Sequence, residues 1–234
     1  PAVIAVRRDA TLAGSLINAL IAAGQEDDFI DPKGALPIIS QRTLCIVVDT
    51  YQLGLVESRE ILEKCGKVAV IDHHRKGVGF IEKADLVCHE PYASSASELV
   101  TEFLQYVGDR DDKPNRIEAE GLLSGIMLDT RDFTLHTGVR TFEAAAALRR
   151  YGAETEHVRQ LFDVSMVEYT TKARLVSEAQ MYRGCAITVS GEVAPEARVA
   201  IAQAANDLLT IQNVEAADAE VTVNMELARS YQKA

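Results

Sequence analysis

Three aspartates in this sequence each stand directly after an apolar run. In open α/β sheets, ligands bind beyond the carboxyl ends of the strands, so an acid at such a point can hold a cation or a substrate. An aspartate is also a common turn former and helix cap, which leaves a structural explanation open for each one taken alone. The three residues are Asp49, Asp72 and Asp129.

The tripeptide Asp72-His73-His74 is the sharpest chemical signal in the chain. Carboxylate and neutral imidazole together suit divalent metals of intermediate hardness, manganese among them. Side chains of successive residues in an extended segment point to opposite sides, so we do not expect one ion to bind all three. We assign His73 to a metal, Asp72 to orienting an imidazole as a hydrogen-bond acceptor, and His74 to the substrate side.

Asp129 is the third candidate metal ligand, because the run Gly125 to Leu128 ends at it. It could join Asp49 and His73 around one cation. The alternative is that Asp129 caps a turn together with Thr130. If Asp49, His73 and Asp129 all bind one cation, coordination positions remain on it for water and substrate.

Four further residues are candidates for contact with a phosphate. Arg131 and Arg140 follow the third aspartate closely and could neutralise phosphate oxygens, although arginines are also common on surfaces. Ser94 and Ser95 lie at a predicted helix start, where free backbone N–H groups and the helix dipole attract anions. Ser95 with Glu98 three residues later is also a capping-box pattern, and capping alone would explain it.

The apolar runs that carry these residues predict a parallel α/β domain. Short runs that are apolar throughout are typical of strands buried on both faces. They alternate with helical segments, and crossovers of this kind are nearly always right-handed, so the expected fold is α/β with a doubly wound parallel sheet. We expect strands at 3–6, 43–48 and 67–71, and helices at 12–23, 57–65, 97–107, 117–128 and 141–151.

The C-terminal part is predicted to form a second, smaller α/β subdomain. Helical spacing runs from Glu168 to Tyr182, and a strand at 185–190 and a helix at 195–209 follow it. The expected organisation is a catalytic domain over 1–160, a connecting helix over 161–184 and a partial substrate-binding subdomain over 185–234.

Composition limits the class of ligand. The chain carries 24 basic and 35 acidic residues, a net charge of −11, which argues against long nucleic acid as a partner. A short anionic substrate is still allowed, because bound metal cations invert the local field. The four cysteines form no CxxC pair, which is typical of reduced thiols in a cytosolic protein. No apolar run is long enough to span a membrane, and the start of the sequence predicts no secretion signal.

Six segments resemble motifs of known phosphoesterases. Three resemble the second to fourth motifs of the DHH phosphoesterase superfamily, which includes single-strand exonucleases, oligoribonucleases and family II pyrophosphatases. The other three narrow the resemblance to cyclic di-AMP phosphodiesterases of the GdpP type. The resemblance as a whole covers essentially residues 1–216. The six segments are Val47–Thr50, Ile71–Arg75 and Gly125–Thr130, and for the narrower group Glu90–Val100, Thr137–Phe142 and Ile201–Asn206.

This resemblance implies a manganese-dependent hydrolase with two metal ions. Asp49 would bridge the two ions, and His73 and Asp129 would complete the shell of the second. Hydrolysis of cyclic di-AMP to the linear dinucleotide pApA would use metal-activated water and no covalent enzyme intermediate. The implied partner is therefore a cyclic dinucleotide.

The resemblance also implies a cellular setting. Relatives of this type usually carry N-terminal membrane helices, a PAS-like sensor and a degenerate GGDEF domain. We therefore expect a full-length protein held at the cytoplasmic face of the cell membrane. The fragment itself is expected to be soluble, to meet the membrane only through segments absent from this sequence, and to be compatible with a homodimer.

The sequence departs from the family pattern in two places. The first motif, a histidine followed by Asp-x-Asp, would stand before Val3 and is not present. In the family, the second, substrate-binding subdomain is called DHHA1, and it normally has a glycine-rich segment that ends in histidine and binds the nucleotide. No such segment is found between Ala194 and Ala234, so the DHHA1 subdomain is expected to be incomplete. We therefore expect the chain as given to hold at most one ion well.

Two alternatives stay open at this point. One is an oligoribonuclease of the same superfamily that hydrolyses pApA and short RNA. The other is a non-catalytic nucleotide-binding module with a degenerate site, which the missing first motif favours. Retention of Asp49, His73 and Asp129 together favours an enzyme.

Overall fold

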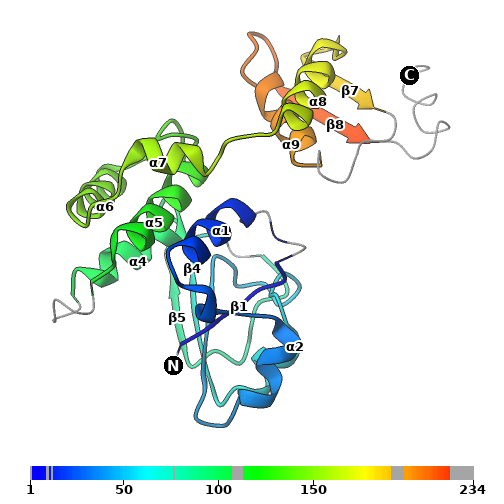
Figure 1. Ribbon diagram of the computed structural model, residues 1–234. Helices are drawn as coiled ribbons and strands as arrows, with labels where there is room; N and C mark the ends of the chain where they lie inside the picture. Colours follow the sequence, from blue (N-terminus) through cyan, green and yellow to red (C-terminus); the bar gives the residue numbers. More distant parts are fainter. Residues whose placement is uncertain are drawn as a thin grey trace. The chain divides into compact units, whose positions relative to one another are not determined.

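The computed structural model of the chain divides into two compact units, Pro1–Phe162 and Asp163–Ala234 (Figure 1). Each unit has its own strands and helices. The residues that the structure describes are 2–8, 11, 13–75, 77–106, 113–190 and 198–221.

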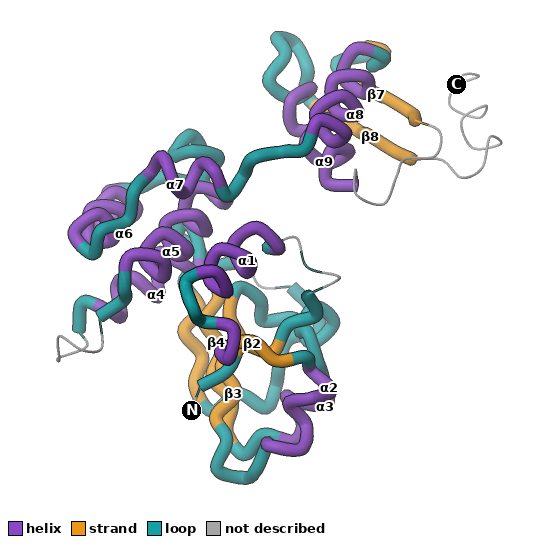
Figure 2. The backbone as a smooth tube through the Cα atoms, in the orientation of Figure 1, coloured by secondary structure: helices purple, strands orange, loops and turns teal. Residues whose placement is uncertain are grey.

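Parallel strands form two sheets in the first unit (Figure 2). The strands are β1 Ile4–Ala5, β2 Phe29–Ile30, β3 Leu44–Val48, β4 Lys67–Asp72 and β5 Leu86–His89. β1 pairs with β2, and β4 lies between β3 and β5. The predicted α/β class with parallel strands is confirmed. The expected single sheet is divided in two, because among the described residues the two-residue strands β1 and β2 pair only with each other.

Burial differs between neighbouring strands. Val68 in β4 is fully buried, because β4 has a partner on each side. In β3 every second side chain from Leu44 to Val48 is more than half exposed, with 56% for Ile46. The prediction that β3 is buried on both faces is therefore wrong, because the described residues leave the face that carries Leu44, Ile46 and Val48 uncovered. Ile4 in β1 is exposed as well.

Helices of the first unit begin at residues that suit helix N-termini. Ser58, Ser95 and Asn115 each accept a hydrogen bond from the backbone N–H three residues further on. The five predicted helices are confirmed as α1, α3, α4, α5 and α6, with small shifts at their ends. The helices of this unit are α1 Gly14–Ala22, α2 Pro32–Ala35, α3 Arg59–Lys64, α4 Ala96–Leu104, α5 Arg116–Asp129, α6 Val139–Arg150 and α7 Thr155–Gln160, with 3₁₀ helices at Glu26–Asp28 and Leu36–Ile38.

Helices α4, α5 and α6 pack against one another (Figure 1). Leu123 of α5 and Leu148 of α6 belong to one buried cluster. α4 approaches α5 so closely that a β-carbon at Gly125 would lie 2.2 Å from the Ser97 hydroxyl oxygen, which explains a glycine inside this helix. Because α5 ends at Asp129, this packing fixes the position of that carboxylate.

A buried carboxylate joins α5 to α7. Glu120 is 6% exposed and accepts hydrogen bonds from Arg116 Nε at 3.0 Å, His157 Nδ1 at 3.1 Å and the Glu154 backbone N–H at 3.3 Å. Burial acts to raise the pKa of Glu120. The hydrogen bonds from Arg116 and His157 outweigh burial and hold the pKa below its ordinary value of 4.5.

Glu120→Gln is expected to make the first unit less sensitive to acid. Because the folded pKa of Glu120 is below the unfolded one, its charge stabilises the fold above pH 4.5, and this contribution is lost as pH falls through the folded pKa. Denaturant titrations across the acid range should show a shallower fall in the free energy of unfolding than the parent shows. Glu143→Gln, at an exposed site on α6, should keep the parental slope, and an equal slope in both variants contradicts the assignment.

The second unit holds a three-stranded sheet and two helices. These are α8 Met166–Ser177, β6 Gln180–Tyr182, β7 Cys185–Ser190, α9 Arg198–Leu208 and β8 Ala216–Val221. β7 pairs antiparallel with β6 and parallel with β8, and α8 packs on α9. The predicted strand at 185–190 and the helix expected at 195–209 are confirmed as β7 and α9. The expected start of that helix falls within 191–197, and the end of the expected subdomain within 222–234, both outside the described residues.

The predicted helix from Glu168 to Tyr182 is too long. α8 ends at Ser177, and Gln180–Tyr182 pairs with β7. The hairpin turns at Arg183 and Gly184, whose φ angles of 48° and 80° are both positive. A two-residue turn of this kind matches the twist of antiparallel strands, so the hairpin replaces the last part of the expected helix. The helix expected as a connector is therefore shorter, and it packs within the second unit.

Candidate metal centre

The ends of β3, β4 and α5 bring the predicted metal ligands together. Asp49 follows β3 directly, and its backbone N–H donates to the Ile71 carbonyl of β4 at 3.0 Å. This pairing places Asp49 beside His73, the first residue after β4. Asp129 is the last residue of α5.

His73 lies between two carboxylates. Its Nε2 is 3.4 Å from Asp49 Oδ1 and 3.5 Å from Asp129 Oδ2. Ligand atoms about 2.1 Å from one octahedral ion would be about 3 Å apart, so each of the two separations suits a pair of ligands on one cation. Among the described residues, the group whose ligand atoms all lie within 4.8 Å of one another is Asp49, His73 and His74. Asp129 is not in that group and approaches it through His73. The donor set of carboxylate oxygens and imidazole nitrogen fits a divalent cation of intermediate hardness.

The charges at the centre also favour a cation. The hydrogen bond to Asp49 raises the pKa of His73, against the opposing effect of burial, and Asp129 raises it further. Burial raises the pKa of Asp129, and the neighbouring Asp49 carboxylate adds to this by repulsion. A bound cation would relieve the repulsion between the two carboxylates and take the place of the proton on His73.

The second ring nitrogen of His73 has its own partner. Nδ1 lies 3.3 Å from the Ala93 carbonyl oxygen, which can only accept a hydrogen bond. A proton held on Nδ1 leaves the lone pair of Nε2 free for a metal. The Ala93 carbonyl therefore selects the tautomer that metal binding needs.

Asp72 is paired with His74 and not with the cation cluster. Its side chain is fully buried, and Oδ1 lies 2.7 Å from His74 Nδ1. The other oxygen, Oδ2, has no hydrogen-bond partner in the described structure. The His74 ring is half exposed, so Asp72 orients a histidine whose Nε2 is left for another partner.

Backbone strain gathers beside the metal ligands. Asp49 has φ +61°, a left-handed conformation that is uncommon for residues other than glycine. Two residues after Asp129 begins a run of positive φ angles, at 46°, 54° and 62° for Arg131, Asp132 and Phe133. Each such residue costs about 1–2 kcal/mol. Strain of this kind clusters at functional sites, where it fixes a side chain that relaxed backbone would misplace.

Ser94 and Ser95, which the sequence predicts to contact a phosphate, make hydrogen bonds within the protein. Both are buried. The Ser94 hydroxyl donates to Glu98 Oε2 at 2.6 Å, and the Ser95 hydroxyl accepts from the Glu98 backbone N–H at 3.0 Å. Capping of α4, the alternative left open by the sequence, accounts for Ser95.

The two predicted phosphate arginines lie in different places. Arg140 donates from Nε and Nη2 to the two carboxylate oxygens of Glu102, both at 2.8 Å, and lies 3.9 Å from Glu98. Arg131 is in the strained turn that follows Asp129. Of the four candidates, Arg131 stands nearest in the chain to a predicted metal ligand, two residues after Asp129. A phosphate contact by any of the four stays a prediction.

Sequence reasoning missed a tyrosine that supports the histidine pair. Tyr51 is buried, donates to the Arg75 carbonyl at 2.7 Å and accepts from the Gly77 backbone N–H. Its ring meets the His89 ring edge-on at 5.7 Å, and His89 Nε2 lies 2.5 Å from the His74 carbonyl. A single tyrosine two residues after Asp49 gives no signal of this role in the sequence, because its partners lie far along the chain.

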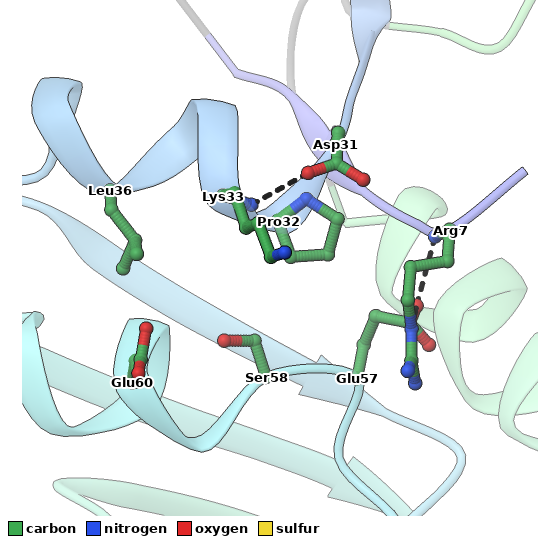
Figure 3. A pocket seen from close by; sticks show the side chains of 8 residues that line it. All are labelled: Arg7, Asp31, Pro32, Lys33, Leu36, Glu57, Ser58 and Glu60. Carbon is green, nitrogen blue, oxygen red and sulfur yellow. Dashed lines mark hydrogen bonds and ion pairs between the residues drawn. The ribbon is translucent and has the colours of Figure 1, made fainter.

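A small cavity of about 180 Å³ lies between the segment after β1, α2 and the start of α3 (Figure 3). Arg7 is paired there with Glu57, through Nε at 2.8 Å and its backbone N–H at 2.9 Å. Lys33 donates its backbone N–H to Asp31 (Figure 3). With Glu60, acids outnumber bases around this cavity, and none of its lining residues belongs to the metal cluster. It therefore does not suit a phosphate.

The chain is similar in sequence to a known family and to proteins of known name. The model of the DHH family, N-terminal domain, matches residues 7–126. The cyclic-di-AMP phosphodiesterase GdpP of Geobacillus thermodenitrificans is 46% identical over 80% of this chain, and the cyclic-di-AMP phosphodiesterase PdeA of Listeria monocytogenes is 40% identical over 81%. The matches cover 28% and 29% of those proteins, so the chain spans less than a third of their length.

A solved structure supports the fold. The crystal structure of an exopolyphosphatase-related protein from Bacteroides fragilis aligns with a TM-score of 0.70 at 19% identity, over 83% of this chain and 61% of that one. At this identity the likeness shows the fold alone. The family model covers just over half of the chain and includes Asp49 and the Asp72-His73-His74 tripeptide. The chain therefore belongs to the DHH family and carries its N-terminal domain.

Proposed function

We propose that the chain is the core of a manganese-dependent phosphodiesterase that hydrolyses cyclic di-AMP to linear pApA. The observation that carries the proposal is the position of His73 Nε2, 3.4 Å from Asp49 and 3.5 Å from Asp129. Identity of 40–46% to proteins named cyclic-di-AMP phosphodiesterase supports the substrate.

The residues divide the work of the reaction between them. Asp49, His73 and Asp129 would hold the divalent cation, and His74 would face the substrate beside it. A cation bound there would lower the pKa of a water molecule and polarise the phosphate. His74, held through Nδ1 by Asp72, presents Nε2 to a phosphate oxygen or to the leaving oxygen. In the described part of the chain, this cluster offers donors for one cation. The proposal therefore assigns one tightly bound ion to these residues. The second expected ion would need ligands that this cluster does not provide.

The test is a paired assay with metal analysis. Purified protein is incubated with cyclic di-AMP or pApA, each with Mn²⁺, Mg²⁺ or no metal, and the products are separated by chromatography. We expect Mn²⁺-dependent conversion of cyclic di-AMP to pApA, and pApA to persist. Faster hydrolysis of pApA assigns the chain to the oligoribonuclease alternative, and nucleotide binding without turnover assigns it to the non-catalytic one.

The cellular location and the oligomeric state of the protein stay predictions. Among the described residues, no helix has both the length and the hydrophobicity needed to cross a bilayer. Anchoring of the full-length protein at the cytoplasmic face of the membrane rests on the family resemblance. The homodimer is a separate prediction.

Asp72→Asn is expected to reduce turnover of cyclic di-AMP by about 10–100-fold, the usual effect of losing a partner that orients a functional histidine. Folding should be retained, because a neutral amide costs less to bury than a carboxylate whose Oδ2 has no partner. A double-mutant cycle with His74→Gln isolates the pair. If Asp72 acts through His74, the Asp72→Asn substitution should cause little further loss of turnover in the His74→Gln background. Equal losses in both backgrounds contradict the orienting role.

A further inference from the structure

The segment after β5 is tied to the metal-centre residues by three hydrogen bonds. Two of them are made by backbone groups of the segment and one by a histidine ring. Together they hold residues 89–93 against residues 72–74. They join the Glu90 backbone N–H to the Asp72 carbonyl at 3.0 Å, His89 Nε2 to the His74 carbonyl at 2.5 Å, and His73 Nδ1 to the Ala93 carbonyl at 3.3 Å.

Tyr92 lies within this segment, and its backbone is fixed. The Ala93 N–H donates to the Glu90 carbonyl at 3.0 Å, which closes a turn with Pro91 at its second position, where proline sets the backbone angle in advance. The Tyr92 N–H lies 3.4 Å from Glu90 Oε1. The residue is therefore held one position from the carbonyl that orients His73.

The side chain of Tyr92 is exposed although its backbone is fixed. It is 91% exposed, while Ala93, Ser94 and Ser95, which follow it, are all buried. Packing within the described residues therefore does not account for a large aromatic side chain at this position. Tyrosine is enriched at interfaces because its ring is apolar and its hydroxyl is polar, so the ring is available to a ligand.

We propose that Tyr92 is a stacking platform for a nucleobase of the bound dinucleotide, a proposal that rests on the function proposed above. A phosphate held at the Asp49–His73–Asp129 centre carries its nucleosides to either side, and Tyr92 directly precedes the residue whose carbonyl lies 3.3 Å from His73 Nδ1. Stacking on an aromatic ring accepts any base, because every base has a π-face. Tyr92 would therefore provide affinity for dinucleotides over base-free phosphates, and it would not select one base over another.

A matched control residue lies at the other end of α4. Tyr106 is 88% exposed, nearly the same as Tyr92. It follows the C-terminal end of α4, whereas Tyr92 precedes the N-terminal end. A nine-residue helix is about 13.5 Å long, so the two rings belong to different places on the surface.

Tryptophan substitution gives a direct readout, because the sequence contains no tryptophan. Tyr92→Trp and Tyr106→Trp each introduce a single fluorophore. Each variant is titrated with pApA and, separately, with ribose 5-phosphate, in the presence of Mn²⁺. We expect saturable quenching of the fluorophore at position 92 by pApA, little effect of ribose 5-phosphate, and no response at position 106.

Calorimetry on the same samples separates the two proposals. If pApA binds and the fluorophore at position 92 does not respond, the stacking role is overturned while the proposed function stands. If pApA does not bind at all, both proposals are overturned. Equal quenching at positions 92 and 106 shows unspecific contact and also overturns the stacking role.

Kinetics give a second, independent readout. Tyr92→Ala is expected to raise KM for cyclic di-AMP by about 10-fold, equivalent to about 1.4 kcal/mol, with kcat within about threefold of the parent. Tyr92→Phe keeps the ring and should restore the parental KM, and Tyr106→Ala should change neither constant. A fall in kcat with KM unchanged, or no rescue by Tyr92→Phe, contradicts stacking.

Discussion

Asp49→Asn is expected to lower turnover of cyclic di-AMP by about 1,000-fold or more, equivalent to about 4 kcal/mol of barrier. Asp49 contributes a carboxylate oxygen 3.4 Å from His73 Nε2, at the point where the proposed cation binds. An amide in its place carries no charge and is a weaker ligand for a hard cation. Calorimetry should show weaker Mn²⁺ binding together with the lost activity.

The same variant should fold normally. Asparagine tolerates the left-handed conformation that Asp49 adopts at φ +61°, whereas alanine does not tolerate it as well. Removal of the charge also ends the repulsion that raises the pKa of Asp129. The free energy of unfolding of the metal-free protein should therefore stay within about 1 kcal/mol of the parent.

Asp27→Asn is the control for this experiment, because Asp27 is an exposed aspartate in the same unit. It should keep the parental activity and Mn²⁺ affinity. Activity of Asp49→Asn within about tenfold of the parent would refute a metal-ligand role. Lost activity with parental Mn²⁺ affinity would place Asp49 on the substrate side instead.

Leu123→Ala should lower the free energy of unfolding of the first unit by about 3 kcal/mol. Leu123 is 1% exposed in the cluster between α5 and α6, and a buried leucine truncated to alanine loses its transfer free energy and leaves a cavity. Denaturant titration followed by circular dichroism measures the change. Because α5 ends at Asp129, weaker Mn²⁺ binding at denaturant concentrations below the transition should accompany it.

Leu128→Ala separates burial from helix propensity. Leu128 lies on the same helix and is 64% exposed, so the substitution changes the helix propensity equally and the buried area little. It should change the free energy of unfolding by less than about 0.5 kcal/mol. A similar loss in the two variants would show that the Leu123 cluster is not the core that holds α5.

The sequence by itself predicted the class of fold and supplied three candidate metal ligands at the ends of apolar runs. Both depend on local pattern: apolar runs that alternate with helical segments indicate parallel strands, and acids at the ends of such runs indicate a site at the strand ends. Asp49, His73 and Asp129 were chosen on that basis and lie together in the structure. Which residue does which step stays a prediction.

Local pattern was misleading where tertiary pairing competes with it. Helical spacing continued to Tyr182, but the turn at Arg183 and Gly184 forms a hairpin with β7. The apolar run of β3 read as a strand buried on both faces, but burial depends on which segments cover it and not on the run itself. Ser94 read as an anion contact, but its hydroxyl is taken by Glu98.

Only the tertiary structure decided how the histidines are held. The Ala93 carbonyl sets the tautomer of His73 from 20 residues away, and Tyr51 supports His89 across a still longer stretch of chain. These partners are a backbone carbonyl and a ring edge, which leave no signature in residue type. Sequence thus determined which chemical groups are present at the strand ends, whereas orientation and protonation depend on contacts that exist only after distant segments have packed.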